Sequence, residues 1–227
     1  MITAENIRKR FGRNVVLDQL DFAPTPGRVT VLLGRNGCGK STFLKLCLGV
    51  LRADEGTLVA PPRNQIGYVP DKPDCYDWMT PNDLFRFLKP QYPTWNDDKV
   101  VRASESLNVP MDRKFGALSR GEGMKAMLVA ALAHEPELLL LDEPFAGLDP
   151  VVREDVLRGI IAELRDDERT VLCATHDLDV AARIADRITV LQDGKIVKHG
   201  DLEDVLGGDD EIGRVPDRMR MLLTEVA

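Results

Sequence analysis

Several features that mark particular classes of protein are scarce in this sequence. The 30 lysines and arginines are outnumbered by 37 aspartates and glutamates, which gives a formal charge of −7 at pH 7. A protein whose main partner is nucleic acid usually carries a basic face, so this balance argues against a nucleic-acid partner. Four cysteines, Cys38, Cys47, Cys75 and Cys173, lack the spacing of disulfide pairs or metal ligands, as expected in a reducing compartment.

Long apolar segments are scarce as well. The longest uncharged apolar run, Ala126–Ala133, is far shorter than the roughly 20 residues that cross a bilayer. The start, Met1–Glu5, lacks the apolar core of a secretion signal. We therefore expect a soluble cytoplasmic chain that reaches a membrane only through a partner. At 227 residues it is long enough to bury a substantial core.

The most informative segment is Gly34–Ser41, which follows the apolar run Val29–Leu33. It matches the phosphate-binding pattern G-x-x-x-x-G-K-[ST], between an expected strand and an expected helix. Its glycines let the backbone curl so that N–H groups point at phosphate oxygens. Lys40 offers a charge to the β- and γ-phosphates, and Ser41 offers a hydroxyl to Mg²⁺. The residues predicted to bind the nucleotide here are Gly34, Arg35, Asn36, Gly37, Cys38, Gly39, Lys40, Ser41 and Thr42. An ordinary glycine-rich turn is the alternative, and it explains neither the lysine nor the serine.

A second nucleotide motif follows about 100 residues later, where the apolar run Leu138–Leu141 leads into Asp142 and Glu143. In P-loop ATPases a buried strand delivers an aspartate to the Mg²⁺ shell, which predicts this role for Asp142. Glu143 is the predicted general base for the attacking water. The alternative is a strand that ends in two solvated acids, which does not explain its place after a phosphate loop.

Four further segments resemble motifs of the ATP-binding-cassette (ABC) ATPases, and the resemblance runs from Phe11 to about Gly200. Leu118–Glu122 resembles their LSGGQ signature, with Arg120 and Glu122 in place of the commoner Gly and Gln. Each motif alone is weak evidence, but these motifs in this order are specific, and the chain is identified as a member of the family. The other three motifs are the aromatic that stacks on adenine, the D-loop and the switch histidine: Phe11, Gly147–Asp149 and His176.

The resemblance implies that the chain binds ATP and Mg²⁺ and forms a head-to-tail dimer with a second nucleotide-binding subunit, a copy of itself or a close paralogue. Ser119 and Gly121 of one subunit are then expected at the γ-phosphate held by Lys40 of the other, and Asp149 belongs to the same nucleotide-binding set. A helix that starts at Gly121 adds its positive dipole end to this anion. The alternative is that Ser119 only caps a helix.

The chain departs from the family at Asp71, where a Gln usually follows a segment like Gly67–Pro70. In the family this Gln touches Mg²⁺ or the attacking water. A carboxylate adds a negative charge and binds a hard cation directly or through water. The alternative is that Asp71 faces solvent or caps a turn. The predicted catalytic residues are thus Glu143, His176 and Asp71, and the predicted metal ligands are Ser41, Asp142 and Asp71.

The pattern of apolar and turn residues predicts an α/β fold: a P-loop NTPase core of mixed sheet with flanking helices, an N-terminal antiparallel β-subdomain and an inserted α-helical subdomain. Strands are expected at 2–7, 15–22, 28–33, 66–69, 138–141, 170–174, 188–192 and 195–198. Helices are expected at 40–50, 82–88, 97–107, 121–134, 150–165 and 178–185. Asp193-Gly194 suits the tight type I′ turn of a hairpin.

We predict a single ABC nucleotide-binding domain over residues 1–227. Its core takes in about 1–70 and 135–206, its helical subdomain about 71–134, and residues 207–227 form a short C-terminal tail.

Aromatic residues make up only 5% of the chain, yet several gather between Tyr76 and Trp95. We expect Phe85 and Phe87 in the small core of the helical subdomain. Tyr76 and Trp78, in a loop rich in Pro and Asp, are candidates for contact with a partner.

The predicted function is an ATP-binding and ATP-hydrolysing subunit that powers a separately encoded transmembrane subunit, held at the inner face of the cell membrane by that partner. Asp71, the LSRG form of the signature and the segment Asp149–Glu154 resemble a bacterial branch of stand-alone cassettes. The alternative is a soluble ABC ATPase acting in assembly or repair without transport. A small-molecule kinase is a third possibility, which the signature, Asp149 and His176 disfavour.

Overall fold

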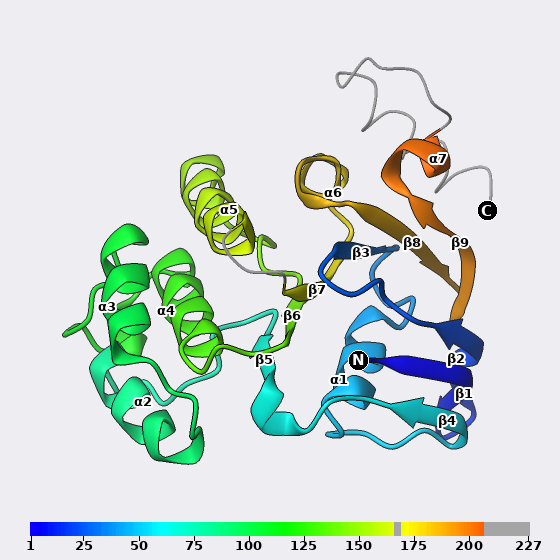
Figure 1. The fold of residues 1–227 in the computed structure, drawn as a ribbon, viewed down its shortest axis with the longest axis horizontal. Coiled ribbons are helices and arrows are strands. Elements are labelled where there is room, and N and C mark those ends of the chain that lie inside the picture. Colours follow the sequence, from blue (N-terminus) through cyan, green and yellow to red (C-terminus); the bar gives the residue numbers. More distant parts are fainter. Residues whose placement is uncertain (166–168, 207–227) are drawn as a thin grey trace. The chain divides into compact units, whose positions relative to one another are not determined.

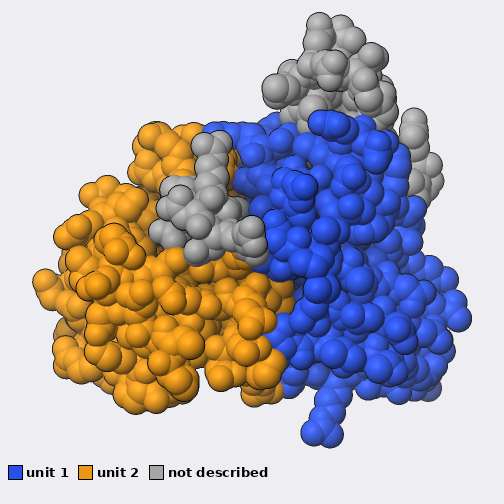
Figure 2. All heavy atoms as spheres, viewed as in Figure 1, with its two compact units in different colours: residues 1–61, 170–227 blue, residues 62–169 orange. Residues whose placement is uncertain are grey.

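The structure is a computed structural model that describes residues 1–165 and 169–206. The chain divides into two compact units, coloured in Figure 2: unit 1 is Met1–Pro61 with Thr170–Ala227, and unit 2 is Pro62–Arg169. Each unit is described by itself. The tail expected at 207–227 lies outside the described residues, and the boundaries of the expected core and helical subdomain stay a prediction.

Unit 1 begins with an antiparallel sheet of three strands in the order β2-β1-β4 (Figure 1). Its strands are β1 (Thr3–Phe11), β2 (Asn14–Phe22) and β4 (Glu55–Val59). Apolar side chains of the first two strands, Ile7, Leu17 and Leu20 among them, are buried while their neighbours are exposed or half-buried. This alternation is what a sheet with one covered face requires.

Unit 1 also contains four strands that are neighbours in the order β7-β3-β8-β9. They are β7 (Thr170–Thr175), β3 (Val29–Leu33), β8 (Arg187–Gln192) and β9 (Lys195–Asp201). β3 pairs in parallel with both β7 and β8, and β8 pairs antiparallel with β9. The turn between the last two strands has φ of 45° at Asp193 and 78° at Gly194, as the type I′ prediction requires. The helices of this unit are α1 (Lys40–Cys47), α6 (Leu178–Ile184) and α7 (Leu202–Leu206).

Unit 2 contains two parallel strands and most of the helices. The strands are β5 (Ile66–Val69) and β6 (Leu138–Asp142), the helices α2 (Pro81–Leu88), α3 (Asp97–Ser106), α4 (Arg120–Leu132) and α5 (Pro150–Arg165), and the 3₁₀ turns η1 (Arg63–Gln65), η2 (Lys89–Gln91) and η3 (Phe115–Ala117). α4 packs closely on β5, because a Cβ at Gly67 would lie 2.4 Å from the carbonyl oxygen of Ala131. The tight contact explains a glycine inside a strand.

The expected strands and helices are confirmed with shifts at their ends, the largest at β1, which continues to Phe11 instead of ending at Ile7, and the short helix α7 was not expected. Three further features differ. α1 ends at Cys47 rather than near Val50, because Gly49 takes a left-handed φ of 64° that stops the helix. β4 was not expected, since its sequence EGTLV alternates weakly and contains a glycine. The interpretation of Phe87 as core was wrong: its side chain is 64% exposed, whereas Phe85 is buried as expected.

His134 is a buried titratable group in unit 2. Its ring stacks on Tyr92 with centroids 4.1 Å apart, and its Nε2 lies 3.3 Å from the carbonyl oxygen of Ile66. Burial lowers the pKa of His134, and the positive charge of Arg169 lowers it further. The neutral imidazole therefore links the end of α4 to the start of β5.

This link predicts a pH-dependent stability of unit 2. Below the ordinary histidine pKa of about 6.5, the unfolded chain binds a proton that folded His134 resists, so folding becomes less favourable as the pH falls. At pH 5.5, amide exchange in α4 should therefore be faster in the wild type than in His134→Gln, which keeps an N–H donor but does not titrate. At pH 7.5 the two proteins should exchange alike. Equal protection at both pH values would contradict this prediction.

Candidate nucleotide site

The segment between β3 and α1 curls back on itself as a phosphate loop does. Gly37 and Gly39 have φ of 84° and 113°, a region that side chains other than glycine rarely adopt. A Cβ at Gly39 would come within 2.7 Å of the Leu17 side chain and 2.9 Å of the carbonyl oxygen of Val16. The loop therefore rests directly on β2, and glycine is required at this position.

Lys40 lies inside this loop. Its side chain is almost wholly buried, and its Nζ donates to the carbonyl oxygens of Gly34 at 2.7 Å and Arg35 at 3.2 Å. These carbonyl oxygens orient the ammonium, and Lys40 is also the first residue of α1, where the helix dipole is positive. A buried cation at a helix start is a suitable place for an anion such as a phosphate group. The residues present thus fit the phosphates of a nucleotide.

His176 lies beside the loop. β7 ends at Thr175, whose carbonyl oxygen accepts from the backbone N–H of Gly34 at 3.4 Å, and His176 follows it. An open hollow is lined by Gly34, Arg35, Asn36 and His176. His176 is 135 or more residues away from Gly34–Ser41 in sequence. The two segments lie side by side because β7, which ends just before His176, pairs with β3, which ends just before the loop.

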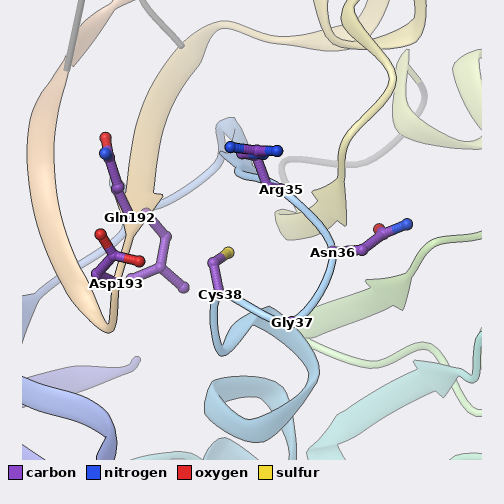
Figure 3. Close-up of a pocket in the computed structure, with 7 residues that line it drawn as sticks. Arg35, Asn36, Gly37, Cys38, Gln192 and Asp193 are labelled. Atoms are coloured by element: carbon purple, nitrogen blue, oxygen red, sulfur yellow. The ribbon is translucent and has the colours of Figure 1, made fainter. Parts of the chain in front are cut away.

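A second hollow of about 410 Å³ lies against the loop (Figure 3). Its walls are Arg35, Asn36, Gly37 and Cys38 of the loop, and Leu191, Gln192 and Asp193 at the end of β8. Figure 3 shows the Cys38 side chain on the side of the loop that faces the β8–β9 turn, while Asn36 points away from that turn. Cys38 is half-buried and forms no disulfide, and it lines this hollow.

Phe11, the predicted adenine-stacking residue, ends β1 and is half exposed. The ammonium of Lys9 lies 5.6 Å from the centre of its ring. A ring that is exposed at the end of a hairpin strand is available for stacking on a base.

The predicted acidic residues belong to unit 2. Asp142, the last residue of β6, is 1% exposed, and the hydroxyl of Tyr68 donates to its Oδ2 at 3.5 Å. Burial raises the pKa of Tyr68, and the negative charges of Asp142 and Asp71 raise it further. Tyr68 therefore stays a neutral phenol that can donate to the carboxylate. Sequence reasoning missed this residue, although its place in the strand just before Asp71 was a signal.

Glu143, the predicted general base, has an unusual backbone. Its φ is +47°, the left-handed region that costs a residue with a side chain roughly 1–2 kcal/mol. Such strain persists only where the surroundings impose it, and it is common at functional sites. The chain thus leaves β6 in a left-handed conformation at Glu143, the residue predicted to be the general base.

Asp71 has an exposed position after β5. Its charge acts on Tyr68, and its backbone carbonyl oxygen accepts from Nη2 of Arg120 at 2.7 Å. Within the described ranges, no three His, Cys, Asp or Glu side chains gather as a metal-binding cluster. The assignment of Asp71 to the Mg²⁺ shell stays a prediction.

The signature segment forms the start of α4. Ser119 accepts from the backbone N–H of Glu122 at 3.2 Å, while the Glu122 carboxylate accepts from the backbone N–H of Ser119 at 2.7 Å. Arg113 donates to Glu122 at 2.8 Å and to the carbonyl oxygen of Ala117 at 2.6 Å. Glu122 thus completes a capping box. Sequence reasoning noted Glu122 only as a departure from Gln, although the spacing S-x-x-E predicts this box.

Gly121 and Asp149 lie at the ends of two helices. A Cβ at Gly121 would come within 2.1 Å of the Val152 side chain, so the start of α4 packs tightly on α5. Asp149 accepts from the backbone N–H groups of Val151 and Val152, both at 3.1 Å, and so caps α5. Capping accounts for this aspartate by itself, and its contact with nucleotide stays a prediction.

Comparison with known proteins finds ABC transporter ATP-binding proteins that are similar to this chain along most of its length. A family model described as ABC transporter matches residues 17–146. An uncharacterized ABC transporter ATP-binding protein of Methanocaldococcus jannaschii is 33% identical over 210 residues, which cover 90% of this chain and 79% of that protein.

Two solved structures have the same fold. The ATP-binding subunit of an ABC transporter matches with a TM-score of 0.84 at 24% identity, over 99% of both chains. A dimeric ATP-binding cassette in a post-hydrolysis state, bound to ADP and Pi, matches with a TM-score of 0.79 at 21% identity, over 88% of this chain and 98% of that one.

The fold and the phosphate loop define an ATP-binding cassette. The chain belongs to the ABC transporter family of ATP-binding proteins, and it is an ATPase. The predicted family and the predicted α/β fold with its antiparallel N-terminal sheet are thereby confirmed.

The position of Cys38 predicts that nucleotide protects it from alkylation. Its thiol faces a hollow beside the loop that is expected to close around phosphates. Iodoacetamide should modify Cys38 several-fold more slowly in the presence of Mg-ATP, as read by mass spectrometry of the tryptic peptides. Cys75, a half-buried thiol of unit 2, is the internal control and should react equally with and without nucleotide. Equal labelling of Cys38 in both conditions would refute the assignment.

The assignment of Asp71 predicts a changed dependence on magnesium. A neutral amide binds a hard cation less well than a carboxylate does. Asp71→Asn should raise the Mg²⁺ concentration for half-maximal ATPase several-fold and leave ATP binding nearly intact. Asp98→Asn removes an exposed carboxylate from α3 of the same unit and should leave the midpoint unchanged. An unchanged midpoint for Asp71→Asn would mean that the side chain is not in the metal's shell.

Proposed function

We propose that this chain is the ATP-hydrolysing subunit of a transporter, that it dimerises around ATP, and that it powers a separately encoded membrane protein. The observation that carries the proposal is the buried Lys40 ammonium in a curled loop, with His176 lining a hollow against the same loop. This arrangement suits triphosphate binding and places a titratable group next to it. Membership of the ABC transporter family supports the link to transport.

The residues have distinct roles in this proposal. Lys40 and the backbone N–H groups of its loop bind the phosphates, and Phe11 stacks on the base. Ser41 and Asp142, with Asp71, would hold Mg²⁺, which neutralises phosphate charge when it is bound. The buried, phenol-bonded carboxylate of Asp142 suits a cation more than it suits solvent.

Glu143 is proposed to accept the proton of the attacking water, and His176 to polarise the departing phosphate. Both residues stand at the carboxyl ends of strands, where ligands of parallel sheets bind. The strained backbone at Glu143 supports a special role for this residue.

A second nucleotide-binding subunit is part of the proposal. Ser119 and Gly121 sit at the start of α4, and this helix end is proposed to meet the ATP held by the partner subunit. The related cassette solved as a dimer with ADP and Pi supports such an arrangement. The partner is a copy of the chain or a close paralogue.

A membrane protein is the other proposed partner, and it would hold the chain at the inner face of the cell membrane. Among the helices described here, none has the length and apolar character for a membrane crossing. Tyr76 and Trp78 are 69% and 64% exposed and stack on each other with centroids 5.7 Å apart. Two exposed aromatic rings side by side are typical of a contact surface.

Replacement of the proposed base tests both chemistry and dimerisation. Glu143→Gln keeps the shape of the side chain but cannot accept the proton, so phosphate release should fall by about 10²- to 10⁴-fold while ATP binding remains. The variant should then accumulate as a dimer in light scattering with ATP and should be monomeric without it, because ATP supplies much of the association.

Lys40→Ala is the matched control for binding, and it should neither bind ATP nor dimerise. Phosphate release by Glu143→Gln near the wild-type rate would overturn the base assignment. Purification from detergent-solubilised membranes of the source cell separates transport from the alternative: a transport subunit should bring a membrane protein with it, whereas an assembly or repair ATPase should not.

A further inference from the structure

Two departures from the family motifs, Asp71 and Arg120, contact each other. Nη2 of Arg120 donates to the backbone carbonyl oxygen of Asp71 at 2.7 Å, although 49 residues separate them in sequence. A guanidinium N–H to a carbonyl oxygen at this distance is a strong, charge-assisted hydrogen bond. The segment after β5 is therefore fastened to the first residue of α4.

A second contact holds the same segment. A Cβ at Gly123 would lie 2.9 Å from Cγ of Pro73, so the backbone of α4 lies directly against this proline. Pro70 and Pro73 flank Asp71 and have no N–H to donate. The donor that the structure shows for the Asp71 carbonyl is Arg120.

The guanidinium of Arg120 also lies against the turn at Gly147. This glycine has φ of +68°, and a Cβ there would lie 3.1 Å from Nη1 and 3.5 Å from Cζ of Arg120. One side chain therefore touches both the segment after β5 and the turn before α5, and its own backbone starts the signature helix. All three segments carry residues proposed to act on nucleotide.

Helix stability does not account for Arg120. It is the first residue of α4, where the helix dipole disfavours a cation. Its Nε is buried and has no hydrogen-bond partner among the described residues, which is a further cost. An acidic residue at this position would stabilise the helix more, so the contacts of the guanidinium with the other two segments are the reason for its presence.

We propose that Arg120 is a positioning residue that couples the signature helix to the segment of Asp71 and to the turn at Gly147. A shift of the helix start then moves the Asp71 carbonyl, three residues after Tyr68, whose hydroxyl donates to Asp142. The structural part of the proposal stands on these contacts. Its functional part rests on the proposed role of the signature in contacting ATP.

The first test is hydrogen exchange of the whole protein without nucleotide. Arg120→Ala should speed exchange in a peptide spanning 66–79 several-fold and leave α3 and the phosphate loop unchanged. Arg158→Ala is the matched control, since it removes an arginine of unit 2 that pairs with Glu154 and Asp155 of its own helix. Unchanged exchange in 66–79 would overturn the proposal.

Arg120→Lys covers the case in which the alanine variant loosens all of unit 2. Lysine keeps the charge and has N–H donors but loses the planar fork, so it should restore only part of the protection. If both variants loosen all of unit 2 with no additional exchange in 66–79, the hydrogen bond does not hold the segment.

The second test separates binding from turnover. Arg120→Ala should leave the Kd of a fluorescent ATP analogue within about twofold, because Lys40 is untouched, and should lower kcat roughly ten- to a hundredfold through misplacement of the coupled segments. Arg120→Lys should recover part of kcat. A variant with faster exchange in 66–79 but wild-type kcat would refute the positioning role. If the wild type itself hydrolyses no ATP, the proposed function fails, while the exchange experiment still decides the contact.

Discussion

The nucleotide site depends on the hydrogen bonds between the Lys40 ammonium and the carbonyl oxygens of Gly34 and Arg35. The ammonium is buried, so its charge is costly unless polar groups surround it, and the fold supplies carbonyl oxygens from the loop that precedes it. The loop that carries those carbonyls curls at Gly37 and Gly39, whose backbone angles other residues rarely adopt. The loop in turn rests on β2, which leaves no space for a side chain at Gly39. The position of the Lys40 charge therefore depends on the loop, and the position of the loop depends on β2.

Much of this site could be predicted from the sequence, because its information is local. Gly34–Ser41 is contiguous, and its spacing alone indicates a strand, a curled loop and a helix start. The same holds for Leu138–Glu143 and for the turn at Asp193-Gly194. Local spacing also predicts the capping box, since Glu122 follows Ser119 at the spacing S-x-x-E and adds a second hydrogen bond to the cap expected from Ser119 alone.

Other features could not be predicted because they depend on residues far apart in the chain. The weakly alternating β4 forms because β1 offers it a partner edge. Asp71 and Arg120 look like unrelated departures in sequence, and only the structure shows that one contacts the other.

The contact of Gly39 with β2 fixes the spacing between Phe11 and the phosphate loop within unit 1. Phe11 pairs with Asn14 across the β1–β2 turn, and the loop touches the same strand at Val16 and Leu17, two and three residues further on. A strand advances about 3.3 Å per residue and resists compression, so the interval between the ring and the loop is set by the backbone. In the proposed binding mode, with the base on Phe11 and the phosphates at Lys40, the β1–β2 hairpin therefore sets the distance that the nucleotide has to span.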